Sequence, residues 1–346
     1  MGESGPFWVP FNFLALPEEQ SQLERARVVV LPVPYDSTTS FKGGARDGPR
    51  AIIEASYSLE DYDPELDADV AQVGIYTAPW LEPHMGGPQH MIERLRKAAY
   101  PFFQQGKLVA TLGGEHSVSI GLVKALVDRY TDPWGPEGLS VLYLDAHADL
   151  RDEYMGTGWG HASVARRISE ICPMVQVGVR SFSLEEKEFI RDERVNTFFW
   201  PPLQPRSHQR KEVESLLPPL WGRTEVGGRE SPPSRPSPIK GEEDFPAKRE
   251  GFVQEIIGLL SRDVYISVDL DVFDPAIMSA VGTPEPGGMD WYQVTSLLRA
   301  VAEERHIVGF DVTELSPGEG PTACAYTAAK LVYKLVAYAT LLGSNR

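Results

Sequence analysis

Short apolar runs alternate with amphipathic stretches along most of this chain. Near-continuous runs of Val, Ile and Leu bounded by turn residues are typical of strands that are buried on both faces of a parallel sheet. The runs that we predict to be strands span residues 27–34, 108–112, 142–149, 175–179, 195–199, 264–268 and 307–312. The predicted strands are therefore enough for one parallel sheet.

The stretches between these runs show helical periodicity. In residues 88–105, Met91, Leu95, Ala98 and Phe102 recur at intervals of three or four, which places them on one face of a helix. The other predicted helices span residues 45–56, 120–130, 184–191, 254–260, 291–304 and 322–342. Alternating strands and helices indicate a single α/β domain across residues 1–346.

One segment, residues 222–250, shows neither a strand pattern nor a helix pattern. It is rich in proline, and Val226, Ile239 and Phe245 are its only larger apolar residues. So little apolar surface cannot offset the entropy that is lost on ordering. We expect a disordered surface insertion, with a partner-binding linear motif as the alternative.

Composition narrows the range of partners and compartments. The chain carries a formal net charge of −16 at pH 7, which disfavours nucleic acid and anionic membranes as partners and favours a small cation. Its two cysteines, Cys172 and Cys324, lie outside any C-x-x-C pattern and suggest a reducing compartment. The start of the chain has no signal-like or membrane-length apolar run, so we expect a cytoplasmic protein.

Three predicted strands end in residues that commonly bind metals. The run from Leu142 leads into Asp145, His147 and Asp149. Alternate side chains of an extended strand share one side, so we expect these three to point the same way. Any one such aspartate could be an ordinary turn residue, but the pattern occurs at three strand ends.

The other two strand ends add three more candidate ligands. Residues 264–268 lead into Asp269 and Asp271, and residues 108–112 lead into His116 near a helix start. Together, four Asp and two His carry more negative charge than one divalent ion needs. Oxygen and imidazole ligands without a thiolate favour Mn²⁺, Mg²⁺, Ni²⁺ or Zn²⁺. The sequence thus predicts a site for two divalent ions.

These motifs resemble those of the ureohydrolase family, the arginase and agmatinase group. They are Gly-Gly-Glu-His-Ser at 113–117, Asp-Ala-His-Ala-Asp at 145–149, Ser-Val-Asp-Leu-Asp-Val-Phe-Asp-Pro at 267–275 and Asp-Val-Thr-Glu-Leu-Ser-Pro at 311–317. Residues 35–37 and 43–52 are more similar to agmatinases than to arginases. The resemblance implies an arginase-like three-layer α/β/α fold with a central parallel sheet and a site at the carboxyl ends of its strands.

The resemblance also implies a ligand set for two Mn²⁺ ions, with Ni²⁺ or another divalent ion as alternatives. The residues that would hold the first ion are His116, Asp145, Asp149 and Asp269. Those that would hold the second ion are His147, Asp145, Asp269 and Asp271. A hydroxide between the ions would attack the substrate, and Asp149 would accept its proton.

Three residues would then handle the substrate. Glu314 would pair with the N–H groups of a guanidinium, and Thr283 would place a hydroxyl in the same pocket. His161 would contact the substrate and shuttle a proton, because an imidazole ordinarily titrates near neutral pH. Asp149, His161 and Glu314 are thus the catalytic residues that the resemblance implies.

The expected reaction is hydrolysis of a guanidino compound to urea and an amine. Agmatine and aminopropyl-agmatine are the leading substrates, while guanidinobutyrate, arginine and guanidine stay open. They stay open because this chain departs from the agmatinase pattern beyond Glu314. Agmatinases often carry acidic residues there, whereas residues 318–320 are Gly-Glu-Gly. Glu319 either faces a distant ammonium of the substrate or is exposed to solvent. The family further implies polyamine biosynthesis and a homo-oligomer, either a trimer or a hexamer.

Three other functions compete with this interpretation. A two-metal phosphoesterase would need phosphate-binding Arg, Lys or Asn near the metals, and the motifs contain none. A deacetylase of related fold would not need the second histidine and the full D-x-D pattern. A non-catalytic metal-binding paralogue should have lost a ligand, and all six are present.

Overall fold

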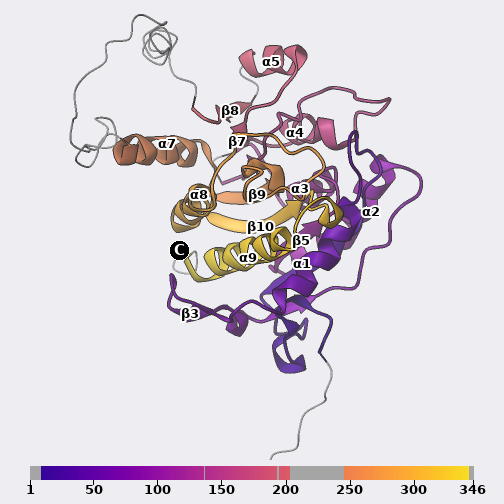
Figure 1. The fold of residues 1–346 in the computed structure, drawn as a ribbon, viewed down its shortest axis with the longest axis vertical. Coiled ribbons are helices and arrows are strands. Elements are labelled where there is room, and N and C mark those ends of the chain that lie inside the picture. Colours follow the sequence, from indigo (N-terminus) through magenta and orange to yellow (C-terminus); the bar gives the residue numbers. More distant parts are fainter. Residues whose placement is uncertain (1–8, 136, 193–194, 203–244, 343–346) are drawn as a thin grey trace, which may run out of the picture.

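A parallel sheet forms the centre of the protein (Figure 1). The computed structural model describes residues 9–135, 137–192, 195–202 and 245–342. Among these residues, the central sheet has eight strands in the order β4-β1-β5-β10-β9-β6-β7-β8, and neighbouring strands pair in parallel. Their bounds are β1 Val28–Val33, β4 Ile75–Thr77, β5 Leu108–Gly113, β6 Leu139–Leu144, β7 Met174–Val179, β8 Asn196–Phe199, β9 Asp263–Asp269 and β10 His306–Thr313.

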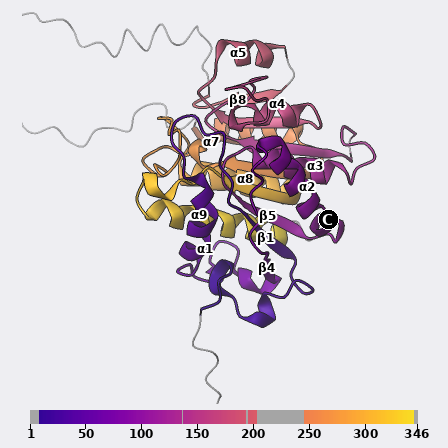
Figure 2. The same ribbon diagram turned by 90° about the vertical axis from the view of Figure 1, so that its right-hand side faces the viewer.

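Helices cover both faces of the sheet, as the two views show (Figures 1 and 2). Their bounds are α1 Gly48–Ser56, α2 Pro88–Gln104, α3 Val118–Val127, α4 Val164–Ser169, α5 Leu184–Arg191, α7 Phe245–Leu259, α8 Trp291–Glu304 and α9 Ala323–Ala337. Within the described part of the chain, no helix is long and apolar enough to cross a bilayer.

The alternation of strand side chains divides the core into two clusters. Val28 and Val30 of β1 belong to the cluster that contains residues of α1, α7, α8 and α9. Val29 and Leu31 belong to the cluster that contains residues of α2, α3 and α4. Successive side chains of a strand point to opposite faces, so one apolar run supplies both layers. The predicted three-layer α/β/α fold is confirmed.

The differences from the predicted elements have local causes. The edge strand β4 and the helix α4 are too short to show a period. The same holds for the hairpin of β2 (Tyr62–Asp63) and β3 (Ala68–Asp69). Residues 203–244, most of the predicted insertion, lie outside the described residues. Its remainder, 245–250, belongs to α7, because good helix formers follow Pro246 in the first turn. The expectation of a disordered insertion over residues 222–250 stays a prediction.

A buried lysine connects helix α9 to the hairpin. Lys334 is 8% exposed, and its Nζ lies 2.7 Å from Oδ2 of the fully buried Asp63 and 2.7 Å from Oε2 of Glu65. Burial raises the pKa of Glu65, but hydrogen bonds from Lys334, Arg299 and Tyr338 outweigh it and hold that pKa below its ordinary value. The stability that ionised Glu65 contributes is therefore present above pH 4.5 and is lost as the pH falls below it.

Replacing Lys334 with Met should lower the free energy of unfolding by about 3 kcal/mol, because the buried carboxylate of Asp63 would lose its counter-charge. Urea unfolding followed by circular dichroism measures the change. The matched control is Lys330→Met on the same helix, where the lysine stands over the ring of Tyr333. We expect the control to cost less than about 1 kcal/mol. Equal losses in the two variants would contradict this role of Lys334.

Candidate active site

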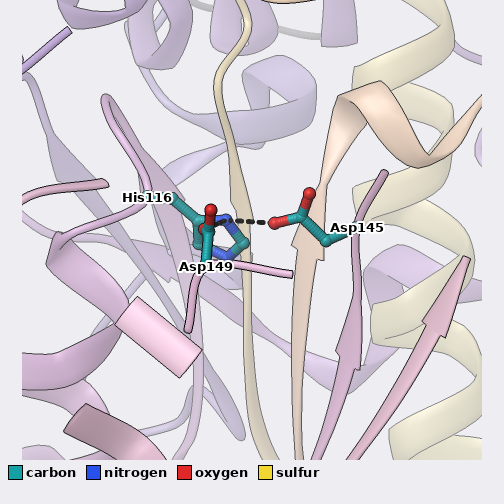
Figure 3. Close-up of side chains that lie close together, drawn as sticks. All are labelled: His116, Asp145 and Asp149. Atoms are coloured by element: carbon teal, nitrogen blue, oxygen red, sulfur yellow. Dashed lines mark ion pairs between the residues drawn. The ribbon is translucent and has the colours of Figure 1, made fainter. Parts of the chain in front are cut away.

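The predicted metal ligands converge at the carboxyl ends of β5, β6 and β9. Nδ1 of His116 lies 3.1 Å from Oδ2 of Asp145, 3.1 Å from Oδ2 of Asp269 and 3.8 Å from Oδ2 of Asp149. Figure 3 shows His116, Asp145 and Asp149 gathered in this way. All four side chains are almost completely buried. They form a compact set of oxygen and nitrogen donors.

A second set of donors lies beside the first. Nδ1 of His147 is 2.8 Å from Oδ2 of Asp271 and 3.6 Å from Oδ1 of Asp145. The two oxygens of Asp145 therefore face different histidines. Asp145 belongs both to the set with His116 and Asp149 and to the set with His147 and Asp271, and the donor atoms within each set lie within 4.8 Å of one another. This arrangement suits two neighbouring cations that share a carboxylate.

The charge and bonding of the cluster also fit divalent cations. Oδ2 of Asp145 is buried, yet it accepts no hydrogen bond from the described residues. Burial and repulsion between neighbouring carboxylates raise the pKa of Asp149, Asp269 and Asp271. Bound cations would offset this concentration of negative charge and would contact this oxygen of Asp145. Oxygen and imidazole donors without sulfur suit Mn²⁺, Mg²⁺, Ni²⁺ or Zn²⁺.

Turns, rather than an extended strand, bring the ligands together. Strand β6 ends at Leu144, and Asp149 has a φ of 52°, so the predicted strand alternation does not place Asp145, His147 and Asp149. Instead, Oδ1 of Asp145 accepts a hydrogen bond from the N–H of His147 at 2.6 Å. Oδ1 of Asp269 likewise accepts from the N–H of Asp271 at 2.8 Å. An aspartate that binds the backbone two residues ahead forms a tight turn, which was not predicted.

A cavity of about 270 Å³ opens beside the cluster. His161, Thr283 and Glu314 all line it, together with the predicted ligands His116 and Asp149. The structure therefore brings the three predicted substrate residues to the same place as the metal donors. Their roles stay predictions.

Glu314 is held in a defined orientation at this cavity. Its φ is 67°, a strained value for a residue other than glycine, and such strain concentrates at functional sites. Oε1 of Glu314 accepts a hydrogen bond of 2.6 Å from the N–H of His116. Burial raises the pKa of Glu314 well above its ordinary value, and the nearby Asp269 and Glu115 add to this effect. A bound cationic group would oppose that rise.

Two basic residues, Lys42 and Arg151, also line the cavity, although the sequence motifs contain no such residue. Lys42 forms an ion pair with Glu319. Arg151 stands 4.9 Å from the ring centroid of Tyr154. Glu319 thus has a cationic partner within the protein, which argues against its facing a distant ammonium of the substrate.

His161 begins a short 3-10 turn, His161–Ser163, and contacts the loop before α1. Its Nδ1 lies 3.2 Å from Oγ1 of Thr38, and its Nε2 lies 3.2 Å from Oγ of Ser40. Burial, with a smaller contribution from the charge of His147, lowers the pKa of His161 to about 4. Burial thus keeps the ring neutral at pH 7, and the part of His161 in proton transfer stays a prediction.

Comparison with known proteins decides the family. The model of the Arginase family matches residues 26–215 and 244–337. This chain belongs to the Arginase family. The resemblance inferred from the motifs is confirmed. The match is interrupted over residues 216–243, a gap that includes most of the proline-rich segment 222–250.

Relatives within the Arginase family align over most of their length. An N(1)-aminopropylagmatine ureohydrolase of Thermus thermophilus is 37% identical over 331 residues, covering 93% of this chain and 94% of the relative. The agmatinase of Pyrococcus horikoshii is 31% identical over 324 residues, covering 91% and 92%. The solved structure of agmatine ureohydrolase from Thermoplasma volcanium has a TM-score of 0.73 at 26% identity, covering 97% of this chain and 96% of that one.

This Arginase-family site also uses residues that sequence analysis missed. The hydroxyl of Tyr143 donates to Oδ2 of Asp149 at 2.7 Å. Nε2 of His116 lies 2.9 Å from Oγ of Ser267, which in turn donates to the buried Asp311 at 2.9 Å. These contacts orient two predicted metal ligands. The sequence did offer one signal for these contacts. Ser267 is a polar residue inside an apolar strand run, and a buried polar group needs a hydrogen-bond partner.

Arg180 is another residue that was missed, and it holds the loops around the site. Its Nη2 donates to the carbonyl oxygens of Asp271 at 2.7 Å and Glu285 at 2.8 Å. Burial lowers the pKa of Arg180, although neighbouring carboxylates oppose this effect. The guanidinium thereby joins the turn that carries the predicted ligand Asp271 to the loop before α8. Its distance in sequence from both loops hides this role.

Proposed function

We propose that this protein hydrolyses a guanidino compound to urea and an amine. The observation that carries the proposal is the pair of donor sets sharing Asp145 beside a cavity that Glu314 and His161 also line. Membership of the Arginase family and relatives named as ureohydrolases support the same reaction. Overall, water is consumed, the bond from the guanidino carbon to the alkylated nitrogen breaks, and the amine leaves with a proton.

Each residue has a distinct part in this reaction. Two divalent cations held by the donor sets would supply a water of lowered pKa and stabilise negative charge that develops in the transition state. Asp149 would take a proton from the attacking water, and the hydroxyl of Tyr143, which donates to its Oδ2, would orient it. Glu314 is anchored through Oε1 and pairs with the N–H groups of the guanidinium. Thr283 lines the same cavity and adds a hydroxyl.

His161 is the candidate for proton transfer to the departing amine. Because burial lowers its pKa to about 4, the imidazole is neutral at pH 7 and can accept a proton before it passes one on. Its ring nitrogens lie near hydroxyl groups of Thr38 and Ser40. These contacts hold the ring at the wall of the cavity while leaving it free of a permanent charge.

The substrate and metal are assigned by chemistry and relationship. We infer that aminopropyl-agmatine or agmatine is the substrate, because relatives at 37% and 31% identity carry those names. A site rich in carboxylates, with two imidazoles and no thiolate, favours Mn²⁺ among the candidate ions. A homo-oligomeric state, a cytoplasmic location and a part in polyamine biosynthesis stay predictions.

Urea release in the presence of Mn²⁺ tests the proposed function. The panel comprises aminopropyl-agmatine, agmatine, guanidinobutyrate, arginine and guanidine, and we expect the highest kcat/KM with one of the first two. A parallel assay with a generic phosphate ester tests the phosphoesterase alternative, for which Lys42 and Arg151 would be the phosphate contacts. Absence of urea from every compound would contradict the proposal.

A further inference from the structure

Glu115 is a buried carboxylate that the reaction above does not use. It is 0% exposed, and its oxygens accept four hydrogen bonds. Oε2 accepts from the N–H groups of Ser37 and Thr38, each at 2.6 Å. Oε1 accepts from the hydroxyls of Ser117 at 2.6 Å and Thr38 at 3.0 Å. So many donors converging on one side chain indicate a purpose beyond filling the core.

The backbone brings Glu115 to this loop. A Cβ on Gly114 would lie 2.0 Å from the carbonyl oxygen of Tyr35, so only glycine permits the approach. The N–H of Glu115 donates to that same oxygen at 2.7 Å. Residues 35–38 are therefore fixed against the segment that carries the candidate metal ligand His116.

Thr38 connects Glu115 to His161. Its Oγ1 lies 3.0 Å from Oε1 of Glu115, 3.0 Å from the backbone nitrogen of His161 and 3.2 Å from Nδ1 of the His161 ring. A hydroxyl has one proton to donate and two lone pairs that accept. Oε1 of Glu115 accepts the hydroxyl proton of Thr38, and the other three contacts of this carboxyl group are also with N–H or O–H donors. The lone pairs of Thr38 are left to accept from the backbone N–H and the ring of His161.

This pattern determines which nitrogen of His161 carries the proton. Thr38 can accept from the ring only if Nδ1 is protonated, and a neutral imidazole has a proton on one nitrogen alone. Nε2 is then the unprotonated nitrogen, with the hydroxyl of Ser40 as its donor at 3.2 Å. Ser40, His161 and Glu314 line the same cavity. The acceptor nitrogen is therefore the one left for exchange with the substrate.

We propose that Glu115 is a positioning residue that fixes, through Thr38, the orientation and the tautomer of His161. Nδ1 carries the proton, and Nε2 exchanges a proton with the reacting groups. The inference rests on the proposed function for the catalytic consequence. The tautomer itself follows from hydrogen bonds and can be observed without turnover.

Substitution of Thr38 tests the catalytic consequence without altering a neighbour of a metal ligand. Thr38→Val keeps the shape and the backbone N–H but removes the hydroxyl, so kcat for urea release from aminopropyl-agmatine and agmatine should fall by about 10- to 100-fold. KM and bound metal should change little. Thr38→Ser restores the hydroxyl and should restore most of the rate. The matched control is Ser37→Ala, which keeps its N–H on Glu115 and should behave like the parent.

Nitrogen-15 spectroscopy tests the tautomer directly. The full-length protein is labelled at histidine and loaded with Mg²⁺, and the His161 signals are identified by their loss in His161→Asn. We expect the signature of a protonated Nδ1 in the parent and its loss in Thr38→Val and Glu115→Gln. A protonated Nε2 in the parent, or an unchanged tautomer in Thr38→Val, would overturn the inference. Absence of urea from every substrate would instead contradict the proposed function.

Discussion

Replacing Asp145 with Asn is expected to abolish urea release and to strip both cations from the protein. Among the described residues, the donor set of His116 and Asp149 and the donor set of His147 and Asp271 have this carboxylate in common, so each would lose an anionic ligand at once. The fall in kcat should exceed the roughly 100- to 1000-fold that loss of one electrostatic contact costs in enzymes. Metal content after dialysis and kcat with Mn²⁺ are the two measurements.

Two further variants sharpen this test. Asp152→Asn is the matched control, since Asp152 is 63% exposed and pairs with Arg167 at the surface. It should keep both cations and the parent rate. Asp269→Ala separates the possible roles of Asp269. Loss of both ions is expected if it bridges them, whereas loss of one would assign it to the His116 set alone. Full metal content and normal turnover in Asp145→Asn would show that the centre is misassigned.

Glu314→Gln should lower kcat/KM by about 100-fold or more while leaving the metal content unchanged. Glutamine keeps the length of the side chain and an oxygen that can accept from the N–H of His116, so the local fold should survive. It loses the negative charge that pairs with a guanidinium. Steady-state urea release, with metal analysis of the same preparations, measures the effect.

The matched control for this variant is Glu319→Gln. Glu319 pairs with Lys42, so neutralising it should change kcat/KM little for either agmatine or aminopropyl-agmatine. A fall in kcat/KM with aminopropyl-agmatine but not with agmatine would mean that Glu319 binds the far end of a long substrate. A fall in kcat/KM as large as that of Glu314→Gln would contradict the assignment of guanidinium binding to Glu314.

The pattern of apolar and polar residues predicted the buried strands of the sheet. The apolar runs at β1, β5, β6 and β9 identified buried strands, since parallel strands covered on both faces need such runs. The motifs that follow three of these strands drew attention to His116, Asp145 and the other predicted ligands, which the structure brings together. In contrast, the edge strand β4 and the helix α4 are too short for a repeating pattern to be recognised, so they gave no signal.

Features that depend on tertiary contact escaped prediction for a different reason. The left-handed backbone of Asp149 is set by how the turn packs against its surroundings, and the strand-like pattern there favoured an extended chain. Thr38 and His161 are far apart in sequence, and no periodicity links a loop threonine to a distant imidazole. The same is true of Arg180, whose backbone partners lie in loops near Asp271 and Glu285.

The strand order also determines when the site can form during folding. Strand β10 lies between β5 and β9, and Gly309 of β10 pairs with Val109 of β5. Contacts between residues so distant in sequence form slowly because loop-closure entropy must be overcome first. A chain emerging from the ribosome therefore cannot complete the cluster until strand β10 is available. Cations that stabilise the folded protein should bind only after β10 has been synthesised.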